Sequence, residues 1–160
     1  MREFETVKFH TTRMRVPLFE VDLGQVVYHG NYFHFYNQAR DTFLRELGFS
    51  YKRLMAEEKH LTIVELSTRF RRPVFYDETI EIQTGISWWR SRSIGMVQRI
   101  FSLGSENEKA LCNEATFNMV AVNFSGRSIT LPNNFIHILE QWIDSPETGE
   151  EKAYRRGRYL

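Results

Sequence analysis

The sequence has one cysteine, no excess of charge of either sign and no long apolar run. Because Cys112 has no second cysteine to pair with, an intrachain disulfide is excluded and a reducing, cytoplasmic location is expected. Lysine and arginine number 21 against 20 aspartates and glutamates, so bulk charge predicts no nucleic-acid partner. No segment approaches the ~20 apolar residues that cross a membrane, and the N-terminus has no apolar signal-peptide region.

Signatures of several catalytic classes are also absent. The chain contains no GxxxxGK(S/T) phosphate loop, no GxGxxG dinucleotide motif, no GxSxG nucleophile elbow and no HExxH zinc pair. Its five histidines never occur four residues apart, and Cys112 has no partner for a zinc site. We therefore expect no metal and no cofactor, so that any chemistry comes from ordinary side chains.

Residues 32–47 have the spacing of a helix that is apolar on one face. The apolar positions follow in steps of three and four: Tyr32, Phe35, Tyr36, Ala39, Phe43 and Leu47. Asn31 is the predicted N-cap, because its side-chain oxygen can accept from free amides of the first turn, and Gly48 is the predicted stop. Because this face carries so many aromatic side chains, it must be buried against another element, and we expect a curved sheet wrapped around the helix.

The rest of the chain is rich in β-branched and aromatic residues between short turn-like breaks. A first strand is expected within residues 9–21, at an edge or bulged because Pro17 lacks an N–H. Longer strands are expected at 60–75, 78–90, 93–103 and 109–124, followed by a short helix at 134–143. We predict one α+β domain over residues 1–144, with strands running consecutively around the helix, and a loose polar tail at 145–160.

The candidate chemistry lies in EVDLGQVVYHGNY, residues 20–32, where Asp22 precedes a short loop and the predicted helix. Taken alone, an aspartate before Leu-Gly is most often a turn residue, because its side chain can bond the backbone two residues on. Here Val26 and Val27, both expected to be buried, lead directly into the helix, so its first free amides point back toward the loop. Such amides carry about half a positive charge and can stabilise an oxyanion. A carboxylate beside them can hydrolyse an activated acyl group, either by activating water or by attacking the carbonyl itself.

Residues 21–48, VDLGQVVYHGNYFHFYNQARDTFLRELG, resemble the signature of hotdog-fold thioesterases of the 4-hydroxybenzoyl-CoA thioesterase type, including the acyl-CoA thioesterases of the Tol-Pal gene cluster. That pattern is an Asp, a small Gly-containing loop, VVYH or VVYF, an Asn-Tyr helix start and a later Ala-Arg. With RRPVFYDETIEI and GRSITLP the resemblance covers about residues 8 to 140. It implies a long central helix wrapped by a curved antiparallel sheet of about five strands, and hydrolysis of an acyl-CoA to a free acid and CoA.

The resemblance assigns Asp22 as the catalytic carboxylate and His29 as its partner, with the His29 amide where the family polarises the thioester carbonyl. The substrate-binding candidates near the helix start are Tyr28, Asn31 and Tyr32. Two positions differ from the family: Leu18 stands where Tol-Pal-type members have a tyrosine, and the loop reads Leu23-Gly24-Gln25 instead of Ala-Gly-Gly or Pro-Ala-Gly. His34 is expected to have only a surface or packing role.

Arg92 and Ser93, in the WWRSRS segment, are further substrate-binding candidates. Strand-end arginines and serines can hold phosphate oxygens, and the family often receives the nucleotide end of CoA in this segment. Solvated residues on a turn are the plainer interpretation. Because hotdog domains usually pair their sheets edge to edge, the resemblance also implies a homodimer or homotetramer with active sites at the subunit boundary.

Two alternatives stay open. The acyl group can arrive on an acyl carrier protein instead of CoA, and rates on the two kinds of substrate separate these cases. In the other alternative, the fold binds an acyl thioester without cleaving it, which would appear as binding with no thiol release. A hotdog dehydratase is a poorer match, because those enzymes resemble a His-Phe-Pro pattern whereas His29 is followed by Gly30 and Asn31.

Overall fold

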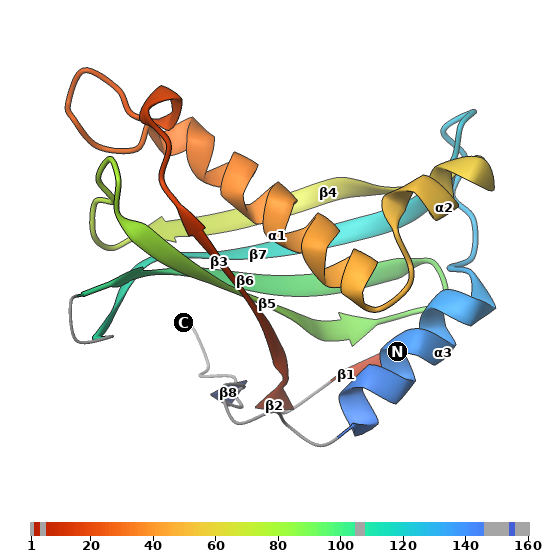
Figure 1. The fold of residues 1–160 in the computed structure, drawn as a ribbon. Helices are drawn as coiled ribbons and strands as arrows, with labels where there is room; N and C mark the ends of the chain where they lie inside the picture. Colours follow the sequence, from red (N-terminus) through yellow and green to blue (C-terminus); the bar gives the residue numbers. More distant parts are fainter. Residues whose placement is uncertain (1, 4–5, 105–107, 146–153, 156–160) are drawn as a thin grey trace.

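The computed structural model describes residues 2–3, 6–104, 108–145 and 154–155. Its main sheet is antiparallel, with long strands in the order β3–β5–β6–β7–β4 (Figure 1). Their bounds are Phe9–Arg15 for β3, Lys59–Phe70 for β4, Thr79–Trp89 for β5, Ser93–Leu103 for β6 and Lys109–Asn123 for β7. β5, β6 and β7 lie where the sequence predicts them, and with the helix across one face the sheet confirms the hotdog architecture. The strand expected within residues 9–21 is shorter than predicted: it ends at Arg15, before Pro17, and Leu18–Glu20 form a turn of 3-10 helix. The strand expected at 60–75 ends at Phe70.

The expectation that the strands run consecutively around the helix is wrong. β4 pairs with β7 and not with β3, so the first two long strands form opposite edges of the sheet. The chain between them carries a long helix across the sheet and therefore enters β4 at the far edge (Figure 1). Among the long strands that the structure describes, only β5, β6 and β7 are neighbours both in sequence and in space.

The long helix α1 (Tyr32–Glu46) lies across one face of the sheet, and its predicted apolar face is buried there. Rings from the helix contact the sheet and the C-terminal helix: Tyr36 lies 5.6 Å from Phe117, and Phe43 lies 4.9 Å from Trp142. The helix ends where predicted, because Gly48 has a φ of 77° that favours glycine. A short helix, α2 (Tyr51–Ala56), leads into β4, and α3 (Asn133–Asp144) follows β7.

A buried polar network fixes the position of α1 on the sheet. Gln98 of β6 donates to the Tyr36 carbonyl at 3.0 Å and to the Thr84 hydroxyl at 2.9 Å. Its carbonyl oxygen accepts from the buried Arg40 guanidinium at 2.8 Å. Because buried polar groups are costly unless they are bonded, this network favours one placement of the helix, including the helix start.

The two ends of the chain form short strands. β1 (Arg2–Glu3) pairs with β5, and β2 (Thr6–Val7) pairs with β8 (Tyr154–Arg155). The predicted loose tail therefore contains one short strand, and its residues 146–153 and 156–160 lie outside the described residues. In the part of the chain that the structure describes, no helix is long and apolar enough to cross a membrane.

Candidate active site

Residues 21–27 form a small hairpin that follows the 3-10 turn Leu18–Glu20 after the first long strand. Val21 and Val27 pair as an antiparallel bridge, and the Asp22 amide donates to the Val26 carbonyl at 3.0 Å. The Val27 amide in turn donates to the Val74 carbonyl at 2.8 Å, which holds the hairpin against the loop before β5. Val27 is buried and Val26 is half-buried, so the expected buried pair is confirmed for Val27 only.

Asp22 lies at the exposed tip of this hairpin. Its Oδ1 accepts a hydrogen bond from the Gly24 amide at 2.7 Å, which is the side-chain turn expected of an aspartate before Leu-Gly. A Cβ on Gly24 would lie 2.9 Å from that oxygen, so a larger residue there would displace the carboxylate. Gln25 completes the turn with a φ of 63°. Among the described residues no second hydrogen bond to the carboxylate is found, and Asp22 is exposed.

The chain enters α1 through a turn of 3-10 helix, His29–Asn31. The Asn31 amide closes this turn on the Tyr28 carbonyl at 2.8 Å, whereas the amides of His29 and Gly30 precede the first internal acceptor. Neither amide donates to another backbone group in the described part of the chain. The helix start therefore presents free N–H groups next to the Asp22 hairpin, with the partial positive charge of a helix N-terminus.

The prediction that Asn31 caps the helix with its side chain is wrong. Asn31 has helical φ and ψ angles of −78° and −13°, and its side chain makes no capping bond. Its Nδ2 instead donates to the Glu20 carbonyl at 3.1 Å. The 3-10 turn starts the helical path before Asn31, and the Asn31 side chain instead joins this turn to the turn Leu18–Glu20 that precedes Asp22.

Tyr28 and His29 are exposed beside the hairpin, and their rings lie 4.2 Å apart. The Tyr28 ring covers Gly30, where an added Cβ would lie 2.8 Å from a ring carbon. Both side chains are thus available to a ligand that reaches the tip. Leu18, which stands where the family pattern has a tyrosine, is also exposed and supplies no hydroxyl.

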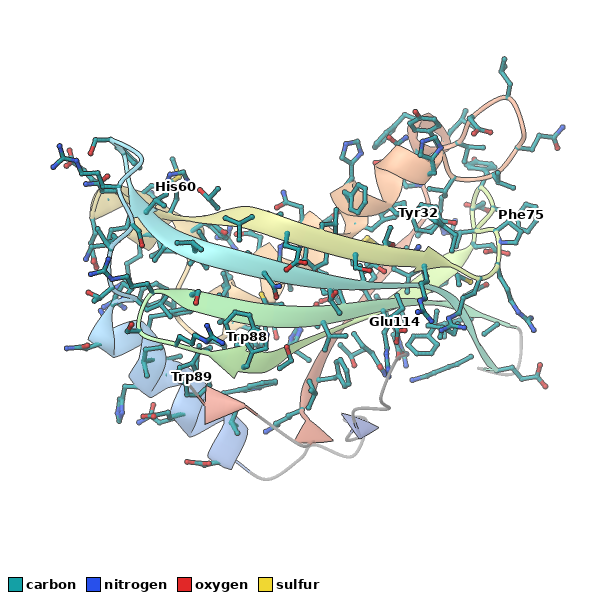
Figure 2. The ribbon with its side chains drawn as sticks, turned by 180° about the vertical axis from the view of Figure 1, so that it is seen from behind. Tyr32, His60, Phe75, Trp88, Trp89 and Glu114 are labelled. Carbon is teal, nitrogen blue, oxygen red and sulfur yellow. The ribbon has the colours of Figure 1, made fainter. Side chains whose placement is uncertain are left out.

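Tyr32 is part of the core and not of the exposed surface. Its ring is 3% exposed and packs edge-on against Phe70 at 5.1 Å. Burial raises the pKa of its hydroxyl above the ordinary 10.0. Figure 2 shows Tyr32 and Phe75 at the same end of the sheet. Tyr32 therefore supports the helix start from beneath, and its assignment as a substrate contact stays a prediction.

Arg92 and Ser93 lie at the opposite end of the sheet from Asp22: Arg92 is in the turn after β5, and Ser93 is the first residue of β6. Figure 2 shows Trp88 and Trp89, next to this turn, far along the sheet from Phe75. The eleven residues of β5 separate the two ends, a length of roughly 33 Å at about 3.3 Å per residue. The structure thus gathers Asp22, Tyr28, His29 and Asn31 but not Arg92 and Ser93.

The pair of Glu20 and His34 at the candidate site was not foreseen. Glu20 is 5% exposed, and its carboxylate lies 3.0 Å from Nδ1 of His34 in the first turn of α1. Glu20 precedes Asp22 by two positions, so its place beside the candidate carboxylate is one signal in the sequence. Its burial and its partner depend on how the helix packs, which the spacing of 14 residues does not reveal.

Comparisons of the sequence with known proteins match it to thioesterases. The family model described as "Thioesterase-like superfamily" matches residues 16–143. The acyl-CoA thioester hydrolase YbgC of Escherichia coli is 36% identical over 110 residues, which are 69% of this chain and 79% of that protein.

Solved structures share the fold. The 4-hydroxybenzoyl-CoA thioesterase of Pseudomonas sp. strain CBS-3 has a TM-score of 0.75 at 20% identity, over 82% of this chain and 99% of that chain. The 1,4-dihydroxy-2-naphthoyl-CoA thioesterase Slr0204 of Synechocystis has a TM-score of 0.77 at 18% identity, over 86% and 99% of the two chains. At these identities the structures establish the architecture alone.

Proposed function

Because the chain belongs to the thioesterase-like superfamily, we propose that it hydrolyses the thioester bond of an acyl-CoA and releases a free acid and CoA. The observation that carries the proposal is the exposed carboxylate of Asp22 next to the free amides at the start of α1. The relative from Escherichia coli, named as an acyl-CoA thioester hydrolase, supports CoA as the carrier of the acyl group. A cytoplasmic location is part of the proposal and rests on the single free thiol, Cys112.

In the base mechanism, the Asp22 carboxylate takes a proton from water while the water oxygen attacks the thioester carbonyl. The carbonyl oxygen becomes negatively charged and accepts hydrogen bonds from the amides of His29 and Gly30, an interaction that contributes on the order of 3 kcal/mol per donor. Collapse of this intermediate breaks the C–S bond, and the sulfur takes the proton held by Asp22 and leaves as the thiol of CoA, which returns Asp22 to its carboxylate form. In the covalent alternative, an Asp22 oxygen attacks the carbonyl carbon, the C–S bond breaks and CoA leaves as its thiolate, and water then hydrolyses the resulting anhydride to the free acid and the Asp22 carboxylate.

The free oxygen of Asp22 suits either mechanism. Oδ1 is occupied by the Gly24 amide, which fixes the orientation of the carboxylate, while Oδ2 is left to act on water or on the carbonyl. The exposed rings of Tyr28 and His29 and the half-buried Asn31 border the same space and are the proposed contacts of the acyl thioester. The electrostatic setting favours a negatively charged transition state, because the helix start supplies positive potential.

We further propose that two copies of the chain join along the free edge of β4. An edge strand offers a row of unpaired N–H and C=O groups, and a long apolar edge is a site for association. Four apolar side chains of β4 are exposed: Ile63 by 43%, Val64 by 62%, Leu66 by 40% and Phe70 by 50%. The opposite edge, β3, is shorter and carries the exposed cations Arg13 and Arg15, which oppose such pairing.

Association also bears on the assignment of Arg92 and Ser93 to the CoA phosphates. Within one chain these residues lie too far from Asp22 to share one reacting thioester with it. A second copy would let the turn between β5 and β6 of one chain serve a substrate held at Asp22 of the other. Arg92 and Ser93 are therefore proposed as substrate contacts in an assembly of at least two chains.

The proposed function is tested by thiol release from a panel of short-chain, long-chain and aromatic acyl-CoA esters. A chromogenic thiol reagent suits the assay, because Cys112 is buried and adds little signal of its own. At least one class of ester should release CoA in many turnovers per chain. Faster release from the same acyl groups on an acyl carrier protein would identify that protein as the carrier. Binding of the esters without thiol release from any of them would contradict hydrolysis.

A further inference from the structure

Glu20 is a buried carboxylate within an otherwise exposed turn. Its side chain is 6% exposed, although the two residues before it are both more than half exposed. Burial of a carboxylate is costly unless a partner compensates it. The other buried glutamates, Glu81 and Glu114, each contact two cationic side chains. Among the described residues, the Glu20 carboxylate contacts only His34.

His34 reaches this carboxylate from the first turn of α1. Its Nδ1 lies 3.0 Å from Oε2 and 3.2 Å from Oε1, so an Nδ1–H can donate to either oxygen. The His34 side chain is nevertheless 66% exposed and takes little part in packing. Substitution of His34 should therefore remove the bond to Glu20 without leaving a cavity in the core.

The main chain of Glu20 joins the two sides of the candidate site. Its carbonyl accepts from the Tyr28 amide at 3.0 Å and from Nδ2 of Asn31 at 3.1 Å. Asp22 follows two residues later, and His29 lies between the two donors. The position of the Asp22 hairpin relative to the helix-start amides therefore depends on where Glu20 is held.

We propose that Glu20 and His34 are positioning residues for the hydrolytic site: His34 holds the Glu20 carboxylate, and Glu20 holds the Asp22 hairpin against the start of α1. The kinetic consequences rest on the proposed hydrolysis at Asp22, whereas the structural ones do not. The pair also has an electrostatic effect, because the negative charge of an unpaired Glu20 carboxylate would lower the positive potential at the start of α1. A hydrogen bond from His34 offsets part of this negative charge, so more of the positive potential is left at the amides that stabilise an oxyanion.

Kinetics of three histidine variants test the positioning role. His34→Ala should lower kcat about tenfold, in line with loss of a hydrogen bond to a charged group, with KM changed less than about twofold. His34→Asn should recover most of the loss, because its side-chain amide can donate from near the position of Nδ1. His137→Ala removes an exposed histidine bonded to Gln141 on α3 and should leave both constants unchanged.

Amide hydrogen exchange at Tyr28 tests the same positioning without any need for turnover. In His34→Ala, the Tyr28 amide should exchange about tenfold faster than in the wild type, because its acceptor on Glu20 is held less firmly. Exchange should be unchanged in His137→Ala and close to wild type in His34→Asn. If the wild type hydrolyses no acyl-CoA, the proposed function fails, and the exchange result still decides the role of the pair. Wild-type exchange in His34→Ala, or equal losses of kcat in the Ala and Asn variants, would overturn the proposal.

Discussion

A lysine at Val64 should weaken the proposed dimer. Val64 is 62% exposed and lies at a bulge of β4, opposite no residue of β7. Full burial of a valine contributes roughly 2 kcal/mol, so covering the exposed part contributes about 1 kcal/mol in each copy. Across a two-fold axis each substitution acts twice, and Val64→Lys should cost about 2 kcal/mol, which raises the dimer Kd roughly 30-fold. A charge placed on an edge strand also opposes pairing directly.

Sedimentation equilibrium over a dilution series measures this Kd. Met55→Lys is the matched control, because Met55 is 58% exposed but lies on α2 and not on the strand edge. The control should keep the wild-type Kd, and Val64→Lys should populate monomer at concentrations where the wild type is dimeric. A wild type that is monomeric at all concentrations, or a Val64→Lys variant that dimerises like the wild type, would refute pairing along β4.

Two predictions concern the stability of the fold. In Gly85→Ala, the added Cβ would lie 2.7 Å from the backbone oxygen of Lys8, so the free energy of unfolding should fall by about 3 kcal/mol; an unchanged midpoint in urea would contradict this packing. Burial raises the pKa of Cys112 above its ordinary 9.0 and that of Tyr32 above 10.0, and it also raises the pKa of Tyr36. The unfolded chain therefore loses these protons first, so stability should be fully present below about pH 9 and fall as the pH rises further. Urea unfolding at about pH 8 and pH 10.5 measures this fall, which Tyr36→Phe should reduce and which a flat profile would exclude.

The helix and the strands could be predicted because each leaves a local pattern. Steps of three and four place the rings of α1 on one face, and Gly48 stops the helix by its left-handed φ. The long strands are segments rich in β-branched and aromatic residues between turn-like breaks. Such patterns say nothing of which strands are neighbours, so the pairing of β4 with β7 was missed. That pairing follows from the path of the helices across the sheet.

The candidate site was predictable to the extent that it is continuous in sequence. Asp22 and the helix start are separated by a few residues, and a short hairpin brings them together. Asn31 was wrongly predicted to cap the helix, whereas its side chain donates to the Glu20 carbonyl. An asparagine at a helix start has the same sequence pattern in both cases. The contact of Glu20 with His34 was missed for a different reason. It arises only when the first turn of α1 packs beside the turn that precedes Asp22.

The role of Asp22 in hydrolysis is tested most directly by the turnover of Asp22→Asn on the best acyl-CoA substrate. Asparagine keeps an Oδ1 that can accept from the Gly24 amide, so the hairpin should survive, but it can neither take a proton from water nor attack a carbonyl. The matched control is Asp41→Asn, which alters an aspartate paired with Arg45 at 2.9 Å on α1. Asp22→Asn should stay folded and lose kcat by at least about 100-fold, while the control should keep wild-type turnover. Wild-type turnover in Asp22→Asn would contradict the claim that Asp22 performs the hydrolysis.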